Sequence, residues 1–134
     1  AVLRGDESHI EVGEGSNVQD GCIVHCSHNL PTVIGRGSSL GHLVCIEGCT
    51  IGDGALVGTG PIMLHRSRVG NGAVLAAGSV LLEGEEVPAG MLAAGVPATV
   101  KKELSGRSAE WVGKPAAHYR PHGAAYRKSL RPLD

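Results

Sequence analysis

The sequence predicts an all-β fold, a parallel β-helix of hexapeptide repeats followed by an α-helical C-terminal segment. Three observations support this prediction. Aliphatic residues recur about every six positions from Val12 to Glu86. The chain contains 21 glycines, three aromatic residues and no phenylalanine, so its core must be narrow and built from small aliphatic side chains. From about Ser105 the composition shifts towards Ala, Lys, Arg and Tyr.

The repeat is the main evidence for the fold. Its units are VGEGSN, VQDGCI and VHCSHN from Val12, IGRGSS and LGHLVC from Ile34, the five-residue IEGCT, and six further units from Ile51 to Glu86. A period of six fits neither an α-helix nor a simple amphipathic strand, but it fits short parallel strands joined by tight turns. Three units then complete one triangular coil, and the coils stack about 4.8 Å apart. A disordered glycine-rich segment is the alternative, and aliphatic residues in register over so many units disfavour it.

These patterns divide the chain into two parts. Residues 1–104 are assigned to the β-helix, and N-terminal coils could be missing from it. Pro88 and Pro97 are expected to stop the stacking. Residues 105–134 are expected to form a helical tail packed along the prism, with Pro115 and Pro121 breaking or kinking it.

Charge and composition exclude several classes of protein. The net charge is −1, which gives no strong field for nucleic acid or an anionic membrane. No apolar run approaches the roughly 20 residues of a membrane helix, and no leader resembles a secretion signal. The four cysteines form two C-x3-C pairs that the repeat scatters among different positions, so buried reduced thiols are favoured over disulfides or a zinc site. Reduced thiols indicate a reducing compartment, and the cytoplasm is the predicted location.

Stacking brings two residues with metal-binding side chains together. His25 is the second residue of VHCSHN, and Glu47 is the second residue of IEGCT, three units later. Residues in the same position three units apart lie above one another, so these two side chains are expected on one face, with Leu64 next in the stack.

A third candidate lies elsewhere on the prism. His42 is the third residue of LGHLVC, near another corner, with Asp20 one coil beneath it. Within one chain His42 cannot easily meet His25 and Glu47, but a symmetry-related copy could bring it there. The geometry therefore predicts a shared site, although each residue taken singly is commonly just a solvated side chain.

Several segments resemble the gamma-class carbonic anhydrases. They are LRGD (Leu3 to Asp6), NVQDGCIVH (Asn17 to His25), Gly41-His42, GCTIGDG (Gly48 to Gly54) and VPAGMLAAGVPATVKKEL (Val87 to Leu104). The similarity covers about the first hundred residues. It implies a left-handed β-helix that forms a homotrimer, with zinc, or alternatively iron or cobalt, at each subunit interface.

The resemblance also implies roles for individual residues. His25 and His42 would be metal ligands, the latter from the adjacent subunit, and Gln19 would hydrogen-bond near the metal-bound water. Arg4, Asp6 and Asp20 would hold the subunit interface. The family's third ligand is a histidine five residues after the second, and this chain has Glu47 there.

The chemistry at Glu47 leads to a hypothesis. Two histidines and one glutamate form a working zinc set, but a carboxylate weakens the Lewis acid relative to a third imidazole. We therefore expect Glu47 to bind the metal and to give a weaker or more alkaline hydratase. His28, in the loop CSHNLPT, and Glu7, after LRGD, are candidates for moving the product proton, and a loop histidine without a proton role is the alternative. His65, His118 and His122 are expected to lie away from the site.

Three functions are consistent with these patterns. The first is a metal-dependent carbonic anhydrase that interconverts carbon dioxide and bicarbonate. The second is a catalytically inactive structural or assembly subunit of the same family, supported by the absence of the third histidine. The third is a hexapeptide-repeat acyltransferase with a histidine base, which the NVQDG segment and His25 disfavour.

Overall fold

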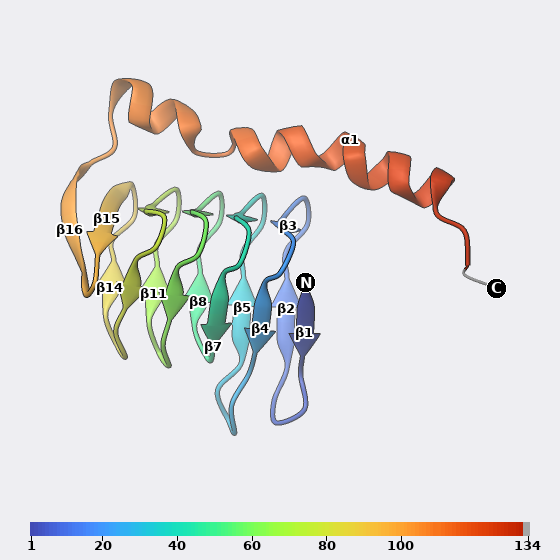
Figure 1. The fold of residues 1–134 in the computed structure, drawn as a ribbon. Helices are drawn as coiled ribbons and strands as arrows, with labels where there is room; N and C mark the ends of the chain where they lie inside the picture. Colours follow the sequence, from blue (N-terminus) through green and yellow to red (C-terminus); the bar gives the residue numbers. More distant parts are fainter. Residues whose placement is uncertain (133–134) are drawn as a thin grey trace.

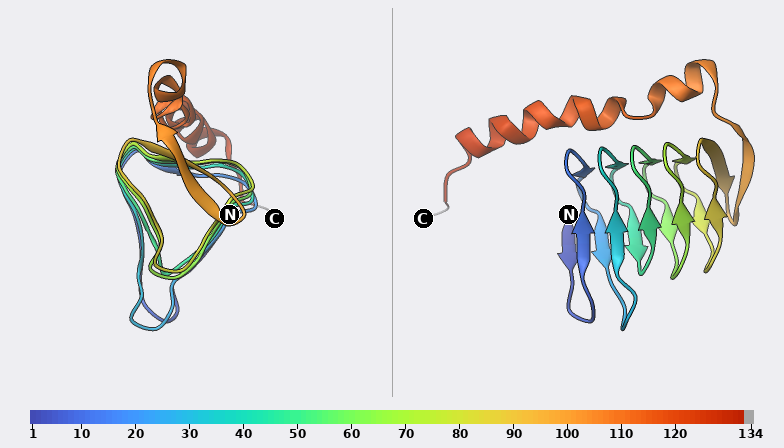
Figure 2. Two further views of the ribbon diagram at one scale, coloured as in Figure 1. Left: turned by 90° about the vertical axis from the view of Figure 1, so that its left-hand side faces the viewer. Right: turned by 180° about the vertical axis from the view of Figure 1, so that it is seen from behind.

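Short strands stack into three sheets that form the sides of a triangular prism (Figures 1 and 2). The computed structural model describes residues 1–132. The first sheet contains β1 (Val2–Arg4), β4 (Ile23–His25), β7 (Cys45–Glu47), β10 (Ile62–Met63) and β13 (Val80–Leu81). The second contains β2 (Ile10–Val12), β5 (Thr32–Ile34), β8 (Thr50–Ile51), β11 (Arg68–Val69) and β14 (Glu86–Val87). The third contains β3 (Asn17–Val18), β6 (Ser39–Leu40), β9 (Leu56–Val57), β12 (Val74–Leu75), β15 (Met91–Gly95) and β16 (Ala98–Glu103).

The chain visits the three sheets in turn, so strands three apart in the sequence pair in parallel. This confirms the predicted all-β fold, a left-handed parallel β-helix of hexapeptide repeats. Stacking ends at β15, where β16 folds back and pairs antiparallel with it. The reversal lies at Val96–Pro97, as expected for this proline. The expectation that Pro88 also stops the stacking is wrong, because β15 follows Pro88 and still pairs in parallel with β12.

The core is a set of three aliphatic columns. Each column contains the first residue of every third repeat unit, or the equivalent residue at the ends, because these side chains point into the prism. The columns are Leu3, Val24, Ile46, Met63 and Leu81; Val12, Ile34, Ile51, Val69 and Val87; and Val18, Leu40, Val57, Leu75 and Ala93. Most members are fully buried, so the interior has no room for large aromatic rings.

Glycine at the second position of many units permits the sharp corners. A Cβ atom on Gly13 would lie 2.5 Å from the carbonyl carbon of Gly35 in the next coil. A Cβ atom on Gly70 would lie 2.5 Å from the backbone nitrogen of Ala89. Any side chain at these corners would force neighbouring coils apart.

The C-terminal segment is helical and runs along the prism towards its N-terminal end (Figure 2). It contains a 3-10 helix, η1 (Gly106–Trp111), and a helix α1 (Lys114–Ser129) that contacts β3. The expected break at Pro115 and Pro121 is wrong. Pro115 lies in the first turn of α1, where its missing N–H costs nothing, and α1 continues through Pro121. None of the helices in the described part of the chain is suited to crossing a lipid bilayer.

Candidate metal centre

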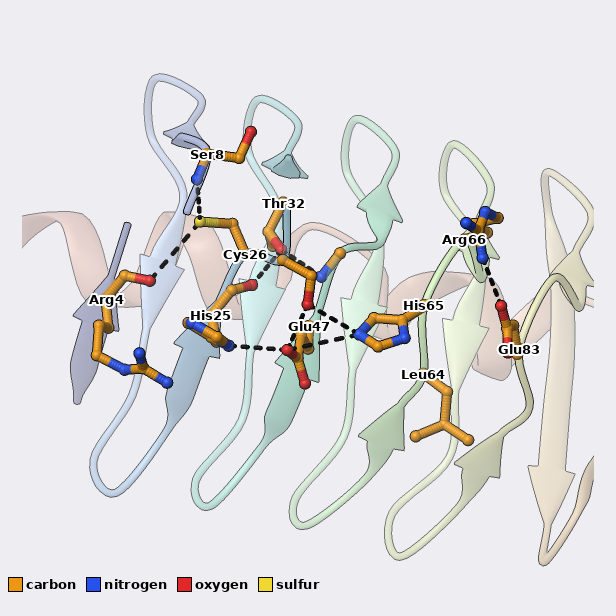
Figure 3. Close-up of polar contacts among 12 residues, drawn as sticks. Arg4, Ser8, His25, Cys26, Thr32, Glu47, Leu64, His65, Arg66 and Glu83 are labelled. Atoms are coloured by element: carbon orange, nitrogen blue, oxygen red, sulfur yellow. Dashed lines mark hydrogen bonds and ion pairs between the residues drawn. The ribbon is translucent and has the colours of Figure 1, made fainter. Parts of the chain in front are cut away.

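The register of β4 and β7 brings His25 and Glu47 together. The two residues are direct partners in this parallel pair, and Glu47 follows the buried Ile46, so its side chain points out of the prism. Nδ1 of His25 lies 2.9 Å from Oε1 of Glu47 (Figure 3). The His25 side chain is only 14% exposed, whereas that of Glu47 is 40% exposed. This is the adjacency that the repeat predicts.

The second ring nitrogen of His25 meets another carboxylate. Nε2 of His25 lies 2.9 Å from Oδ1 of Asp6, and the other oxygen of Asp6 pairs with Arg4. Hydrogen bonds from His25 and then from Arg4 lower the pKa of Asp6. His25 is therefore held between two carboxylates, and only one of its nitrogens can carry the proton while the imidazole is neutral.

Glu47 has two further neighbours on its own chain. Oγ of Ser27 donates to Oε1 of Glu47 at 2.5 Å. Nε2 of His65 lies 3.4 Å from the same oxygen (Figure 3). The Ser27 hydrogen bond is the main cause that lowers the pKa of Glu47, followed by those of His25 and His65, against the opposing effect of burial.

The expectation that His65 lies away from the site is therefore wrong. The stack of second positions contains His25, Glu47 and Leu64, whereas the stack of third positions contains Cys26, Gly48 and His65. Because glycine has no side chain, a histidine stacked beside it has room to reach towards the neighbouring stack. The sequence contains this glycine–histidine pattern. His118 and His122, which were also expected to lie elsewhere, are on α1.

His42 lies at a different place on the prism. Its Nδ1 is 3.4 Å from Oδ2 of Asp20, in the coil beneath it, and its side chain is 47% exposed. Among residues 1–132 the structure gives its Nε2 no partner, and it contains no group of three acidic, histidine or cysteine side chains arranged to hold a metal ion. One chain thus places His25 and Glu47 together but leaves His42 apart from them.

The remaining predicted site residues have diverse surroundings. Nε2 of Gln19 donates to Oδ1 of Asn17 at 3.1 Å, which fixes the amide near β3. Glu7 and His28 are exposed, on the two loops that project from one corner of the prism (Figure 2). The structure gives neither side chain a hydrogen bond or ion pair with another described residue.

The cysteines are thiols rather than disulfides in the described chain. Cys22, Cys26 and Cys49 are buried, and Cys45 is exposed on the first sheet. Burial raises the pKa of the Cys49 thiol to about 12, so it stays protonated and packs as an apolar side chain.

The donor set fits a divalent cation shared between two copies. Two imidazoles and one carboxylate are an established zinc combination, with a fourth position left for water or substrate. His42 has the arrangement typical of a metal-bound histidine, because Asp20 lies 3.4 Å from one ring nitrogen while the structure gives the other no partner among residues 1–132. On His25, a metal would have to replace either Asp6 at Nε2 or the hydrogen bond to Glu47 at Nδ1.

The lowered pKa of Glu47 predicts an acid-dependent contribution to stability. Its pKa in the folded chain lies below the ordinary value of 4.5, so the stabilisation is present above that pH and is lost as the pH falls through the folded-state pKa. Because the side chain is 40% exposed, solvent screening limits the effect to less than about 1 kcal/mol.

We therefore expect metal-free protein to unfold at a higher temperature than its Glu47→Gln variant at pH 7, by about 2–4 °C. The difference should shrink as the pH falls below 4.5 through the folded-state pKa, where the carboxylate becomes protonated. Thermal unfolding followed by circular dichroism in the presence of a chelator measures the difference at pH 7 and at a pH below the folded-state pKa. A difference that is the same at both pH values would contradict this assignment.

Comparison with known proteins gives a consistent set of relatives. The chain is 48% identical over 119 residues to a protein of Methanocaldococcus jannaschii named "probable carbonic anhydrase", and the match covers 89% of this chain and 75% of that protein. It is 36% identical over 124 residues to the mitochondrial gamma carbonic anhydrase 2 of Arabidopsis thaliana, covering 88% of this chain but only 45% of the plant protein. No family model matches the chain.

Solved structures share the architecture. A hexapeptide transferase family protein from Anaplasma phagocytophilum has a TM-score of 0.85 and 40% identity, covering 96% of this chain and 74% of that chain. Perosamine N-acetyltransferase from Caulobacter crescentus has a TM-score of 0.61 and 25% identity, covering 70% of this chain and 42% of that chain. The same prism thus occurs in solved proteins that are named as transferases.

Proposed function

Since the chain belongs to the gamma-class carbonic anhydrase family, we propose that it catalyses the reversible hydration of carbon dioxide to bicarbonate, using a metal held between the subunits of a homotrimer. The relatives are the first support for this activity. The observation that carries it is the His25–Glu47 pair, because its two metal-binding side chains face outward from neighbouring strands at 2.9 Å.

The proposed ligands come from two copies of the chain. His25 and Glu47 belong to one subunit, and His42 belongs to the next. Zinc is the proposed metal, with iron or cobalt as alternatives, since all three accept imidazole ligands. When bound, such an ion would lower the pKa of its bound water to about 7 and so supply a nucleophile at neutral pH.

Other residues would form the subunit interface, orient substrate or water, and carry the product proton. Asp6 bonds His25 in the single chain, so metal loading at Nε2 requires Asp6 to turn away, and a subunit interface built from Arg4, Asp6 and Asp20 would give it a new partner. The Gln19 amide would orient substrate or water. His28 and Glu7 would carry the product proton to solvent, for which their exposure suits them.

One observation favours a second function within the same family. Both ring nitrogens of His25 and Oε1 of Glu47 already have polar partners, so the cluster is satisfied without a metal. A structural or assembly subunit without catalysis would need nothing more. An acyltransferase is less well supported, because the probable carbonic anhydrase is 48% identical to this chain, whereas the transferase-named structure is 40% identical. The buried thiols favour a reducing compartment, and the cytoplasm is the proposed location of the protein.

Metal content and hydration rate of the purified protein test the proposal. We expect about one metal ion per chain in the trimer, and carbon dioxide hydration above the uncatalysed rate that disappears when a chelator removes the metal. Stopped-flow assay with a pH indicator measures the rate, and light scattering measures the assembly. A trimer that binds zinc and does not hydrate carbon dioxide would support the structural subunit, and a chain that binds no metal would exclude the proposed enzyme.

A further inference from the structure

We propose that Leu43 anchors the trimer interface by packing between Ile23 and Cys45 of the neighbouring copy. This contact would hold His42, the residue before Leu43, against the neighbour's half of the shared site. The inference rests on the proposed function, and it adds to that function a positioning residue outside the set of metal ligands.

The backbone at Leu43 has a conformation that leucine rarely adopts. Leu43 lies at the corner between β6 and β7, with a φ of +60°. The equivalent corners of the other coils contain Gly21, Gly60 and Gly78, with φ values of +73°, +79° and +66°. A left-handed backbone is unfavourable for a residue with a bulky side chain, and such residues concentrate at functional sites. A leucine in this column of glycines therefore indicates a role for its side chain.

The contacts of Leu43 within its own chain do not supply this role. The other non-glycine residues with a positive φ among residues 1–132 are Asn29 and Arg66. Asparagine tolerates this conformation, and Arg66 pairs with Glu83. The Leu43 side chain leans over Gly21, where a Cβ atom would lie 2.5 Å from its Cδ2, yet it stays 64% exposed. An apolar side chain presented in this way indicates a surface that another molecule covers.

The outward face of the first sheet is apolar beside the His25–Glu47 pair. The strand register places Ile23, Cys45 and Ile62 in one outward column. Ile23 and Ile62 are 44% and 41% exposed, and Cys45 is exposed as well. The third sheet is contacted by α1, and the equivalent column of the second sheet is mostly polar. That column contains Glu11, Val33, Thr50, Arg68 and Glu86. The first sheet is thus the face best suited to contact another copy.

This column lies within reach of the residue that follows His42. Ile23 comes two residues before His25 on β4, so both side chains point outward. Cys45 has the same relation to Glu47 on β7. Two residues of a strand span about 6.6 Å. Consecutive Cα atoms are about 3.8 Å apart, and a leucine side chain can span the remaining distance.

Cyclic symmetry brings Leu43 to the correct level along the stack. The corner that contains Leu43 leads directly into β7. The Leu43 N–H donates at 3.0 Å to the carbonyl of Asp20, at the corner that leads into β4. In a cyclic ring of prisms that stand side by side, a residue meets its neighbour at the same level. Ile23 on β4 and Cys45 on β7 are therefore the apolar side chains that Leu43 would meet.

Cysteine cross-linking tests this contact directly. Leu43→Cys places a thiol beside the native Cys45 of the neighbouring copy. Diamide oxidises two neighbouring thiols to a disulfide and takes up their two protons and two electrons. Treatment of the zinc-loaded assembly should therefore give covalent dimers and trimers on non-reducing gels. Leu43→Cys/Cys45→Ser should give none, and neither should Leu130→Cys, whose thiol lies at the exposed end of the tail.

A second set of variants separates the side chain from the backbone. Leu43→Asn keeps a residue that tolerates the left-handed turn but removes the apolar contact. The protein concentration at which trimers half-dissociate should rise at least about tenfold, and zinc affinity should fall with it. Leu43→Met keeps an apolar side chain and should change neither value by more than about twofold.

Arg66→Asn is the matched control, because Arg66 has the same backbone conformation at a corner between the first and second sheets. It should leave assembly and zinc affinity unchanged. Analytical ultracentrifugation measures the assembly, chelator competition measures the affinity, and circular dichroism checks that each variant is folded.

Two kinds of result would overturn the inference, and they differ. Zinc-binding trimers in which Leu43→Cys does not cross-link, or in which Leu43→Asn behaves like Arg66→Asn, would refute the anchor while the proposed function stands. A parent chain that stays monomeric in the presence of zinc would refute the proposed function and the inference together.

Discussion

Replacing Glu47 with histidine should increase carbon dioxide hydration at neutral pH. A third neutral imidazole leaves the full charge on the metal, whereas a carboxylate offsets part of it and weakens the Lewis acid. We expect the inflection of the rate–pH profile to move down by about one unit, which corresponds to a rate about five- to tenfold higher at pH 7. Stopped-flow assays from pH 6 to pH 9 measure the shift.

Two matched variants make this result interpretable. Glu47→Gln removes the charge and keeps the shape, so it should lose metal affinity without gaining rate. Glu83→His places the same new side chain at an exposed carboxylate that pairs with Arg66, and it should leave the profile unchanged. Unchanged zinc content in Glu47→His without any gain in hydration rate would contradict the view that Glu47 limits the reaction.

The stacked architecture was predictable because the repeat dictates it. The inward columns contain the first residues of the units, so reading the chain in sixes gave the core, the three sheets and the His25–Glu47 adjacency. The unit IEGCT is one residue short, but the strands at its two ends keep their pairing register. Its first aliphatic residue still points into the core.

The contacts that the sequence did not predict depend on side-chain rotamers, which decide whether a side chain reaches into the neighbouring stack. The repeat gives each residue a stack but not its rotamer, so the contact of His65 with Glu47 was missed although Gly48 marks the space for it. The contact of His25 with the Asp6 carboxylate was missed for the same reason, because Asp6 lies in the loop just after β1. In the tail, proline rules predicted a break that α1 does not show at Pro121.

Mixing two inactive variants should restore metal sites if each site is shared between copies. His42→Ala chains keep His25 and Glu47, and His25→Ala chains keep His42. Each pure variant should bind little metal and show almost no hydration. In a trimer with cyclic symmetry, a complete site needs a His42→Ala chain followed by a His25→Ala chain. Random assembly at equal amounts therefore yields about a quarter of the wild-type metal content and rate.

A second mixture, of wild-type chains and a double variant, also tests whether the site is shared between subunits. Wild-type chains combined equally with the double variant His25→Ala/His42→Ala should retain about a quarter of the sites if ligands come from two subunits, but about half if one chain holds them all. Co-refolding with two affinity tags and native mass spectrometry verifies that mixed trimers form. Mixed trimers without recovery in the first mixture, or with half the sites in the second, would contradict a shared site. The distance of His42 from the His25–Glu47 pair in the single chain makes the shared arrangement the one that a three-ligand site requires.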